Sequence, residues 1–117
     1  MCQESVEVVT REGVVPGEPF SLAGLVDYTP GSITSRIIQR GGAGSVTVFA
    51  IEAGEEIGEH STPCDALAMV LDGAAEVEVG EQSRVVEQGQ MVLMPARVPH
   101  SLRARRRFKM LLVMLRG

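Results

Sequence analysis

Hydrophobic and polar positions alternate in short runs along most of the chain. The clearest run is residues 75–79. Its two valines, Val77 and Val79, fall on one face of an extended chain, and its two glutamates fall on the other. Comparable runs recur about every ten residues and are separated by turns rich in glycine or proline. This recurrence is typical of an antiparallel sandwich or barrel, and no stretch has the periodicity of a helical domain.

The runs predict a series of strands from residue 32 onward. They lie at residues 33–39, 45–51, 54–60, 66–71, 75–79, 83–87, 91–94, 100–104 and 108–115. The Asp72-Gly73 pair is a strong signal for a two-residue hairpin between the strands that flank it. Together these strands predict an all-β fold, an antiparallel β-barrel or jelly roll, in which closure protects the strand edges.

The N-terminal quarter of the chain is less regular. Short strands are predicted at residues 6–9 and 21–26, and prolines interrupt the pattern between them. The chain is long enough for one core. We therefore predict a single domain, with an N-terminal arm and short strands at residues 1–30 and a barrel at residues 31–117.

Composition narrows the class of function. Of the 117 residues, 44% are hydrophobic and 22% are charged, which fits a folded domain rather than a disordered chain. Aromatic residues make up only 3% and the net charge is −4, so a nucleic-acid partner is disfavoured. The longest apolar run, residues 110–115, is too short to span a bilayer, so we expect no membrane partner.

The cysteine count bears on the compartment. Cys2 and Cys64 are the only two cysteines, which are too few for a disulfide scaffold, and no signal peptide precedes them. We therefore expect a reduced, cytoplasmic protein.

The chain has two histidines, His60 and His100, each beside a short predicted strand and a turn that contains proline. A single histidine is more often structural than a ligand. Strands that flank hairpins can curl to face one interior, so the pair predicts a shared site, with two separate structural roles as the alternative.

Two sequence motifs around these histidines resemble those of the cupin family. The matching residues are Gly54, His60, Thr62, Ala66 and Gly73 in the first motif, and Gly89, Pro95 and His100 in the second. The motifs occur in the family's order, and the resemblance covers roughly residues 32–115. It implies a small single-domain barrel of the cupin type, similar to the RmlC-like proteins.

The resemblance also implies a metal site, because the family pattern supplies two His and one Glu from the first motif and one His from the second. His60 and His100 match the first and last of these ligands. Thr62 stands where the second His would be, and Ala66 where the Glu would be. Two imidazoles and water hold a divalent ion weakly. We therefore expect one transition metal (Zn, Fe, Mn, Ni or Cu) to be bound weakly or to be absent.

Cys64 and Asp65 are candidate replacements for the missing metal ligands, since they lie in the same loop as His60. Cys64 would favour Zn(II) or Fe(II), and Asp65 would complete a two-His, one-carboxylate set suited to iron or manganese. The alternative is that Cys64 is a small buried hydrophobe and Asp65 caps the turn.

Four residues are candidates for lining a ligand pocket: Thr62, Met69, Met94 and Tyr28. Thioethers can line a pocket or contact Cu(I), although methionines on apolar strands more often pack in a core. Tyr28 is the only tyrosine and is a candidate proton donor.

Two classes of function remain open. The first is a stand-alone domain that binds a small molecule, with or without a divalent metal, between His60 and His100. The second is a small metalloenzyme, since the family that the chain resembles includes dioxygenases, isomerases and decarboxylases. No catalytic residue is predicted.

The expected assembly is a homodimer. Barrels of the cupin type commonly pair through their sheets, and an N-terminal strand can add to the edge of a neighbour.

Overall fold

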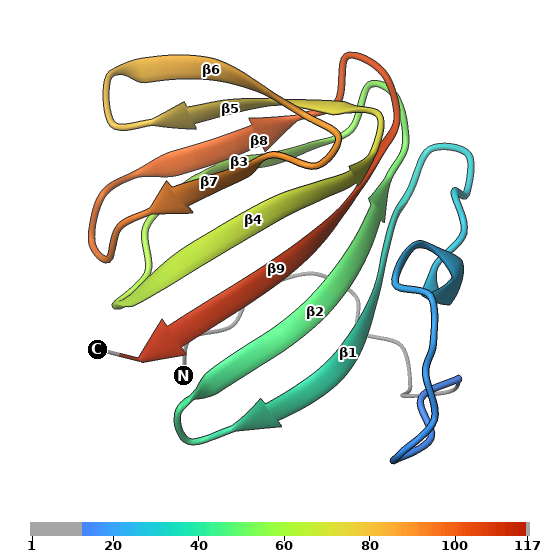
Figure 1. The fold of residues 1–117 in the computed structure, drawn as a ribbon. Helices are drawn as coiled ribbons and strands as arrows, with labels where there is room; N and C mark the ends of the chain where they lie inside the picture. Colours follow the sequence, from blue (N-terminus) through green and yellow to red (C-terminus); the bar gives the residue numbers. More distant parts are fainter. Residues whose placement is uncertain (1–12, 117) are drawn as a thin grey trace.

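The computed structural model describes residues 13–116, which fold as two antiparallel β-sheets packed face to face (Figure 1). One sheet has the strand order β1-β2-β9-β4-β7, and the other has the order β3-β8-β5-β6. The strands are β1 (Ile33–Gly41), β2 (Gly44–Ile51), β3 (Glu56–His60), β4 (Cys64–Asp72), β5 (Ala74–Val79), β6 (Gln82–Glu87), β7 (Met91–Met94), β8 (His100–Arg103) and β9 (Phe108–Arg116). No pairing joins the two sheets within the described residues, so they form a jelly-roll sandwich rather than a closed barrel.

The strands lie within a few residues of their predicted positions, so the all-β prediction is confirmed. Residues 21–26 differ, because they contain the short 3-10 helix η1 (Ala23–Leu25) and no strand. The strand predicted at residues 6–9 lies outside the described residues. In the described part of the chain, no helix has the length and apolar character needed to cross a membrane.

Side chains from both sheets meet in one hydrophobic core. Along β4, every second side chain points inward, and Cys64, Ala66, Ala68 and Val70 are each at most 2% exposed. The largest buried side chains of this core are Phe49, Ile51, Met94, Phe108, Met110 and Met114. Burial of a large apolar side chain stabilises the fold by about 1.5–3 kcal/mol. The core therefore fixes the distance between the sheets.

Gly73 lies where the chain leaves one sheet for the other. β4 pairs with β7 and β9, whereas β5 pairs with β6 and β8, so Asp72-Gly73 does not form the predicted hairpin. Gly73 has a φ of 77°, and an added Cβ would lie 2.3 Å from the carbonyl oxygen of Arg107. The Asp-Gly pair correctly predicts a turn with positive φ. The turn connects strands of two different sheets instead of two paired strands.

The segment before β1 packs on the outer face of the five-stranded sheet (Figure 1). Leu25 and Val26 are buried there against Val48 and Ala50 of β2, and these four residues form a second, smaller core. The segment lies over side chains instead of along a strand edge. This position explains why residues 21–26 form a helical turn and not a strand.

Tyr28 fastens this segment to the sheet. Its hydroxyl donates a hydrogen bond of 2.6 Å to Oδ2 of Asp72. The Arg107 guanidinium lies 4.4 Å from the Tyr28 ring centroid, and Nζ of Lys109 lies 5.1 Å from it, both within the range of cation–π contacts. Burial and the Asp72 carboxylate raise the pKa of Tyr28, so the hydroxyl keeps its proton at neutral pH.

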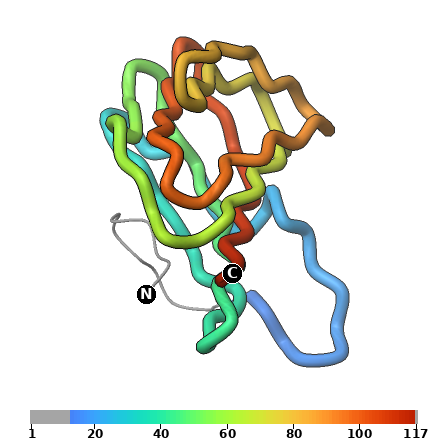
Figure 2. The backbone as a smooth tube through the Cα atoms, turned by 90° about the vertical axis from the view of Figure 1, so that its left-hand side faces the viewer, coloured from blue at the N-terminus to red at the C-terminus, as the bar shows by residue number. Residues whose placement is uncertain are grey.

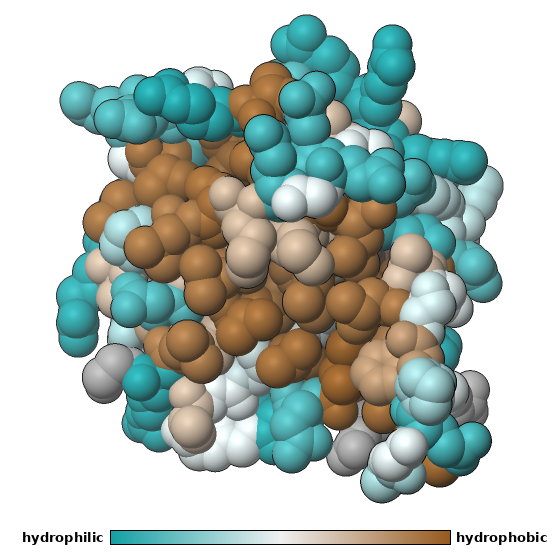
Figure 3. Space-filling model, viewed as in Figure 1, coloured by the Kyte–Doolittle hydropathy of each residue, from teal (hydrophilic) through white to brown (hydrophobic). Residues whose placement is uncertain are grey.

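The remainder of the outer face of the five-stranded sheet is apolar. Six partly or fully exposed side chains from β7, β4 and β9 make up what we call the outer apolar face: Leu67, Met69, Met91, Leu93, Val113 and Leu115. Met91 and Leu93 are 52% and 54% exposed. Figure 3, in the view of Figure 1, shows hydrophobic residues gathered in a broad area on the side where β4, β9 and β2 lie. Exposed apolar patches of this kind commonly mark interaction surfaces.

Replacing Gly73 by Ala should destabilise the fold more than the same change at Gly89. Both glycines have a positive φ, but no atom lies within 4 Å of a Cβ added at Gly89. The left-handed backbone alone costs a non-glycine residue about 1–2 kcal/mol, and the contact with the Arg107 carbonyl adds to this cost in Gly73→Ala. Urea denaturation measures both losses of unfolding free energy. Equal losses of unfolding free energy in the two variants would contradict a steric cost from the Arg107 carbonyl at Gly73.

Candidate functional site

A bulge in β3 aims the His60 side chain inward. Ile57 pairs with Leu102, and His60 pairs with His100. Three steps along β3 therefore match two steps along β8. Side chains alternate along a regular strand, so without the extra residue Ile57 and His60 would fall on opposite faces. The bulge places both on the inner face of the four-stranded sheet.

The two histidines, which lie far apart in the sequence, are in contact. Their ring centroids are 4.3 Å apart and their planes meet at 66°, an edge-to-face arrangement. His100 is only 2% exposed, and Nε2 of both rings is buried. The structure therefore places His60 and His100 together inside the sandwich.

Backbone carbonyls orient both rings. Nδ1 of His60 lies 2.8 Å from the carbonyl oxygen of Gly58, and Nδ1 of His100 lies 3.3 Å from that of Val98. A carbonyl oxygen only accepts hydrogen bonds, so these contacts require a proton on Nδ1. In the neutral imidazole, Nε2 then carries the lone pair that can accept a hydrogen bond or bind a metal.

The histidine pair belongs to a row that crosses the four-stranded sheet. His60 pairs with His100, His100 with Val79, and Val79 with Gln82. Cross-strand partners share a face, so all four side chains are on the inner face. The row lies at the end of the sandwich where β3 turns into β4, β5 into β6 and β7 into β8, the end seen in Figure 2.

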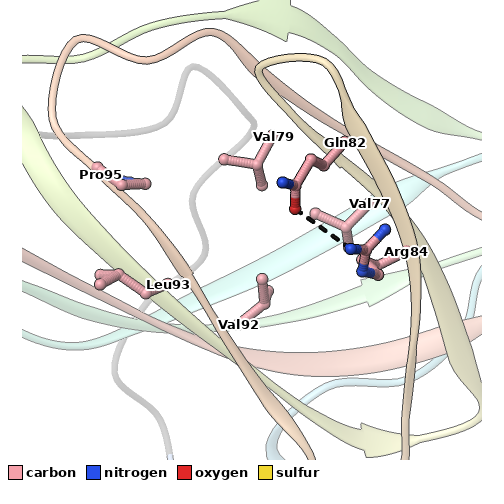
Figure 4. Close-up of a pocket in the computed structure, with 7 residues that line it drawn as sticks. All are labelled: Val77, Val79, Gln82, Arg84, Val92, Leu93 and Pro95. Carbon is pink, nitrogen blue, oxygen red and sulfur yellow. Dashed lines mark hydrogen bonds between the residues drawn. The ribbon is translucent and has the colours of Figure 1, made fainter.

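A cavity of about 340 Å³ lies between the β5–β6 hairpin and β7. The residues that line it are Val77, Val79, Gln82, Arg84, Val92, Leu93 and Pro95 (Figure 4). The volume is within the range of known small-molecule sites. His60 and His100 do not line this cavity, but Val79, the partner of His100, does. The rings therefore lie one strand away from the cavity wall.

Arg84 and Gln82 are the polar side chains of the cavity wall. Arg84 shares the inner face with its partner Val77. Nη2 of Arg84 donates to Oε1 of Gln82 at 3.3 Å, and Nη1 donates to the carbonyl oxygen of Ser83 at 3.0 Å. Both acceptors are neutral, so within residues 13–116 no carboxylate offsets the positive charge of Arg84.

Thr62, which was predicted to line the pocket, and Cys64, which was predicted to bind a metal, are both engaged in other interactions. Oγ1 of Thr62 donates to the carbonyl oxygen of Cys64 at 3.0 Å and accepts from its backbone N–H at 3.3 Å, which forms a local turn. Cys64 is 1% exposed and disulfide-bonded, contrary to the expectation of a reduced protein. A disulfide sulfur is not a thiolate, so Cys64 offers no metal ligand in this state.

Asp65 points away from the histidines, because its neighbours Cys64 and Ala66 point into the core. Its Oδ1 accepts a hydrogen bond of 2.8 Å from the backbone N–H of Ala96. This is the turn-stabilising alternative that the sequence left open. The described residues contain no cluster of three or more His, Cys, Asp or Glu side chains able to hold a metal. The described residues therefore offer too few neighbouring donor atoms for a metal site with three or four protein ligands.

The loops that carry the two histidines are tied to each other. Arg97 precedes His100 with a φ of 65°, at a position where the second cupin motif has glycine. Its backbone N–H donates to the carbonyl oxygen of Thr62 at 2.7 Å. Together with the contact between Asp65 and Ala96, this hydrogen bond joins the β3–β4 and β7–β8 connections.

The predicted pocket residues are divided between the two faces of the sheet. Met94 is fully buried in the core, opposite Ala66. Met69 lies on the outer face, since the side chains on either side of it along β4 point inward. Tyr28 also lies on the outer face, where it binds Asp72. Contrary to prediction, Met69 and Tyr28 are therefore away from the histidine pair.

The sequence interpretation missed Gln82, Arg84 and Val92. The signal for the first two was present, because the turn after Val79 fixes the register of the β5–β6 hairpin. In that register Gln82 faces inward with Val79, and Arg84 faces inward with Val77.

Comparison with known proteins agrees with this fold. A family model described as "Cupin domain" matches residues 47–114, which is more than half of the chain. A conserved protein of unknown function from Streptococcus pyogenes is 32% identical, with a TM-score of 0.85, and the match covers 93% of this chain and 96% of that one. No curated protein matches the chain.

Two further solved structures carry cupin names. A cupin 2 conserved barrel domain protein from Leptotrichia buccalis is 33% identical, with a TM-score of 0.80, over 83% of this chain and 47% of that one. A cupin superfamily protein from Desulfitobacterium hafniense has a TM-score of 0.83 at 23% identity, over 89% of this chain and 95% of that one. With the family model matched across both histidines and the jelly-roll sheets in place, this chain belongs to the cupin family.

Proposed function

We propose that this protein is a small-molecule-binding cupin whose ligand occupies the cavity between the β5–β6 hairpin and β7. The observation that carries the proposal is the cavity of about 340 Å³, whose wall includes Val79, the strand partner of His100. Val77, Val79 and Val92 supply apolar walls, while Gln82 and Arg84 supply hydrogen-bond donors. An apolar cavity with a few polar groups is typical of sites for small organic molecules.

The histidines lie behind the cavity wall, one strand away, so a ligand in the cavity would reach them by extending past Val79, the partner of His100. Their Nδ1 atoms are held by the carbonyls of Gly58 and Val98, which fixes the direction of each ring. Nε2 is then the atom through which each ring can accept a hydrogen bond from a hydroxyl or amine.

A tightly bound metal is not part of the proposal, because the donor set does not support one. The family pattern would need donors at positions 62 and 66, where Thr62 is engaged in a local turn and Ala66 offers a methyl group. A divalent ion held by His60 and His100 alone would bind weakly and would depend on water for its other ligands.

A small metalloenzyme remains the second candidate, on the observation that two Nδ1-anchored imidazoles are in edge-to-face contact. In such an enzyme the metal would supply Lewis-acid chemistry. His60 and His100 would hold it through Nε2.

Filling the cavity should abolish ligand binding. Val92 lines the cavity from β7, whereas Val85 is 62% exposed on the other face of β6. Saturation-transfer NMR with benzamide, cyclohexanecarboxamide and the corresponding carboxylates tests the proposal. We expect Val92→Phe to weaken binding at least about tenfold, and Val85→Phe to leave it unchanged. Binding of no probe, or equal binding by both variants, would contradict the proposal.

Metal analysis separates the two candidate functions. We expect protein purified without a histidine tag to retain substoichiometric metal after dialysis, because only two protein ligands are available. Zn(II), Fe(II), Mn(II), Ni(II) and Cu(II) should each bind weakly in titrations. Stoichiometric metal that disappears in the His60→Ala, His100→Ala double variant would favour the metalloenzyme instead.

We also propose that the protein is a homodimer formed through the outer apolar face. Met91 and Leu93 are more than half exposed, and their partners on β4, Met69 and Leu67, continue the same apolar surface. A second copy presents the same surface, so a two-fold arrangement would cover both.

The dimer proposal predicts that one charge on this face separates the subunits. Leu93→Glu would bury a carboxylate in the interface, whereas Val85→Glu alters an exposed residue of the other sheet. Light scattering at micromolar concentration should report a dimer for the wild type and for Val85→Glu, and a monomer for Leu93→Glu. A monomeric wild type would refute the proposal.

A further inference from the structure

We infer that the ligand of this cavity carries a single carboxylate, bound between Arg84 and Gln82, with an apolar body against the valines. The inference rests on the proposed function, because it requires the cavity to be a binding site. Three observations carry it: the charge of Arg84, the orientation of the Gln82 amide and the apolar character of the remaining wall.

Arg84 is the only charged residue among the seven that line the cavity. Its hydrogen-bond partners are the side-chain oxygen of Gln82 and the carbonyl of Ser83, so its charge has no counter-ion in the described chain. A guanidinium has five N–H donors in a planar arrangement that matches a carboxylate. The two hydrogen bonds to Gln82 and Ser83 leave the other N–H groups of Arg84 available for a ligand. An anionic group of the ligand would complete the coordination of this side chain.

Gln82 supplies a second donor beside Arg84. Its Oε1 faces Arg84, so its amide N–H groups point the other way. Figure 4 shows the amide nitrogen directed into the space between Val79 and Pro95. One carboxylate oxygen can therefore accept from Gln82 and the other from Arg84.

The apolar residues of the wall favour an apolar group in the remainder of the ligand. Val77, Val79 and Val92 present only methyl groups to the cavity. Gln82 and Arg84 are themselves exposed, so a carboxylate held there stays close to water and avoids the cost of burying an isolated charge. The inferred ligand is thus amphipathic, with an apolar part inside and one negative charge at the mouth.

Matched acid and amide probes test the inference. Benzoate is compared with benzamide, and cyclohexanecarboxylate with its amide, since each pair differs little except in charge. The wild type should bind the carboxylates about tenfold more tightly than the amides, and this preference should decrease as salt is added. Arg84→Gln should abolish the preference.

Arg103→Gln is the matched control, because Arg103 lies on the outer face of the same sheet, opposite Glu76. It removes the same charge and should retain the preference for carboxylates. Amides that bind the wild type as well as carboxylates do, with binding lost in Val92→Phe, would overturn the inference and leave the proposed function standing. A preference that survives Arg84→Gln would also overturn it. Binding of neither acids nor amides would remove the proposed function itself.

Discussion

The register of β8 between β3 and β5 is the constraint on which the candidate site depends. It aligns His100 with His60 on one side and with Val79 on the other, and the bulge in β3 turns His60 onto the shared face. A slip of one residue in either pairing would move a histidine to the outer face. Hydrogen bonds from the Ala96 and Arg97 backbone fasten the neighbouring turns, so the turn geometry and the strand register support each other.

Alternation and turn chemistry were enough to predict the strands, because both are local properties of the sequence. The choice of a partner strand is not local. Asp72-Gly73 has the residues of a hairpin turn, yet the chain crosses to the other sheet there because β4 is already paired with β7 and β9 on its two sides. Residues 21–26 are apolar enough for a strand, but they lie over a sheet face, where Leu25 and Val26 are buried against Val48 and Ala50.

The candidate site was predictable in part. The motif positions identified His60 and His100, which the structure brings into contact. Met69 could not be placed from the sequence, since its side depends on a register that is fixed only by pairing with other strands. Arg84 was overlooked because a charged residue on an edge strand looks like ordinary surface until its partner, Val77, is known to face inward.

β6 lies at one edge of the four-stranded sheet. It pairs only with β5, five of its six residues are exposed, and Val86 is its one contribution to the buried core. The side chains at the cavity mouth thus belong to an edge strand with a small share in the buried core. Exchange of such surface residues usually changes stability by no more than about 0.5 kcal/mol. Substitutions on β6 can therefore alter which chemical groups the cavity mouth accepts while the sandwich behind it keeps its stability.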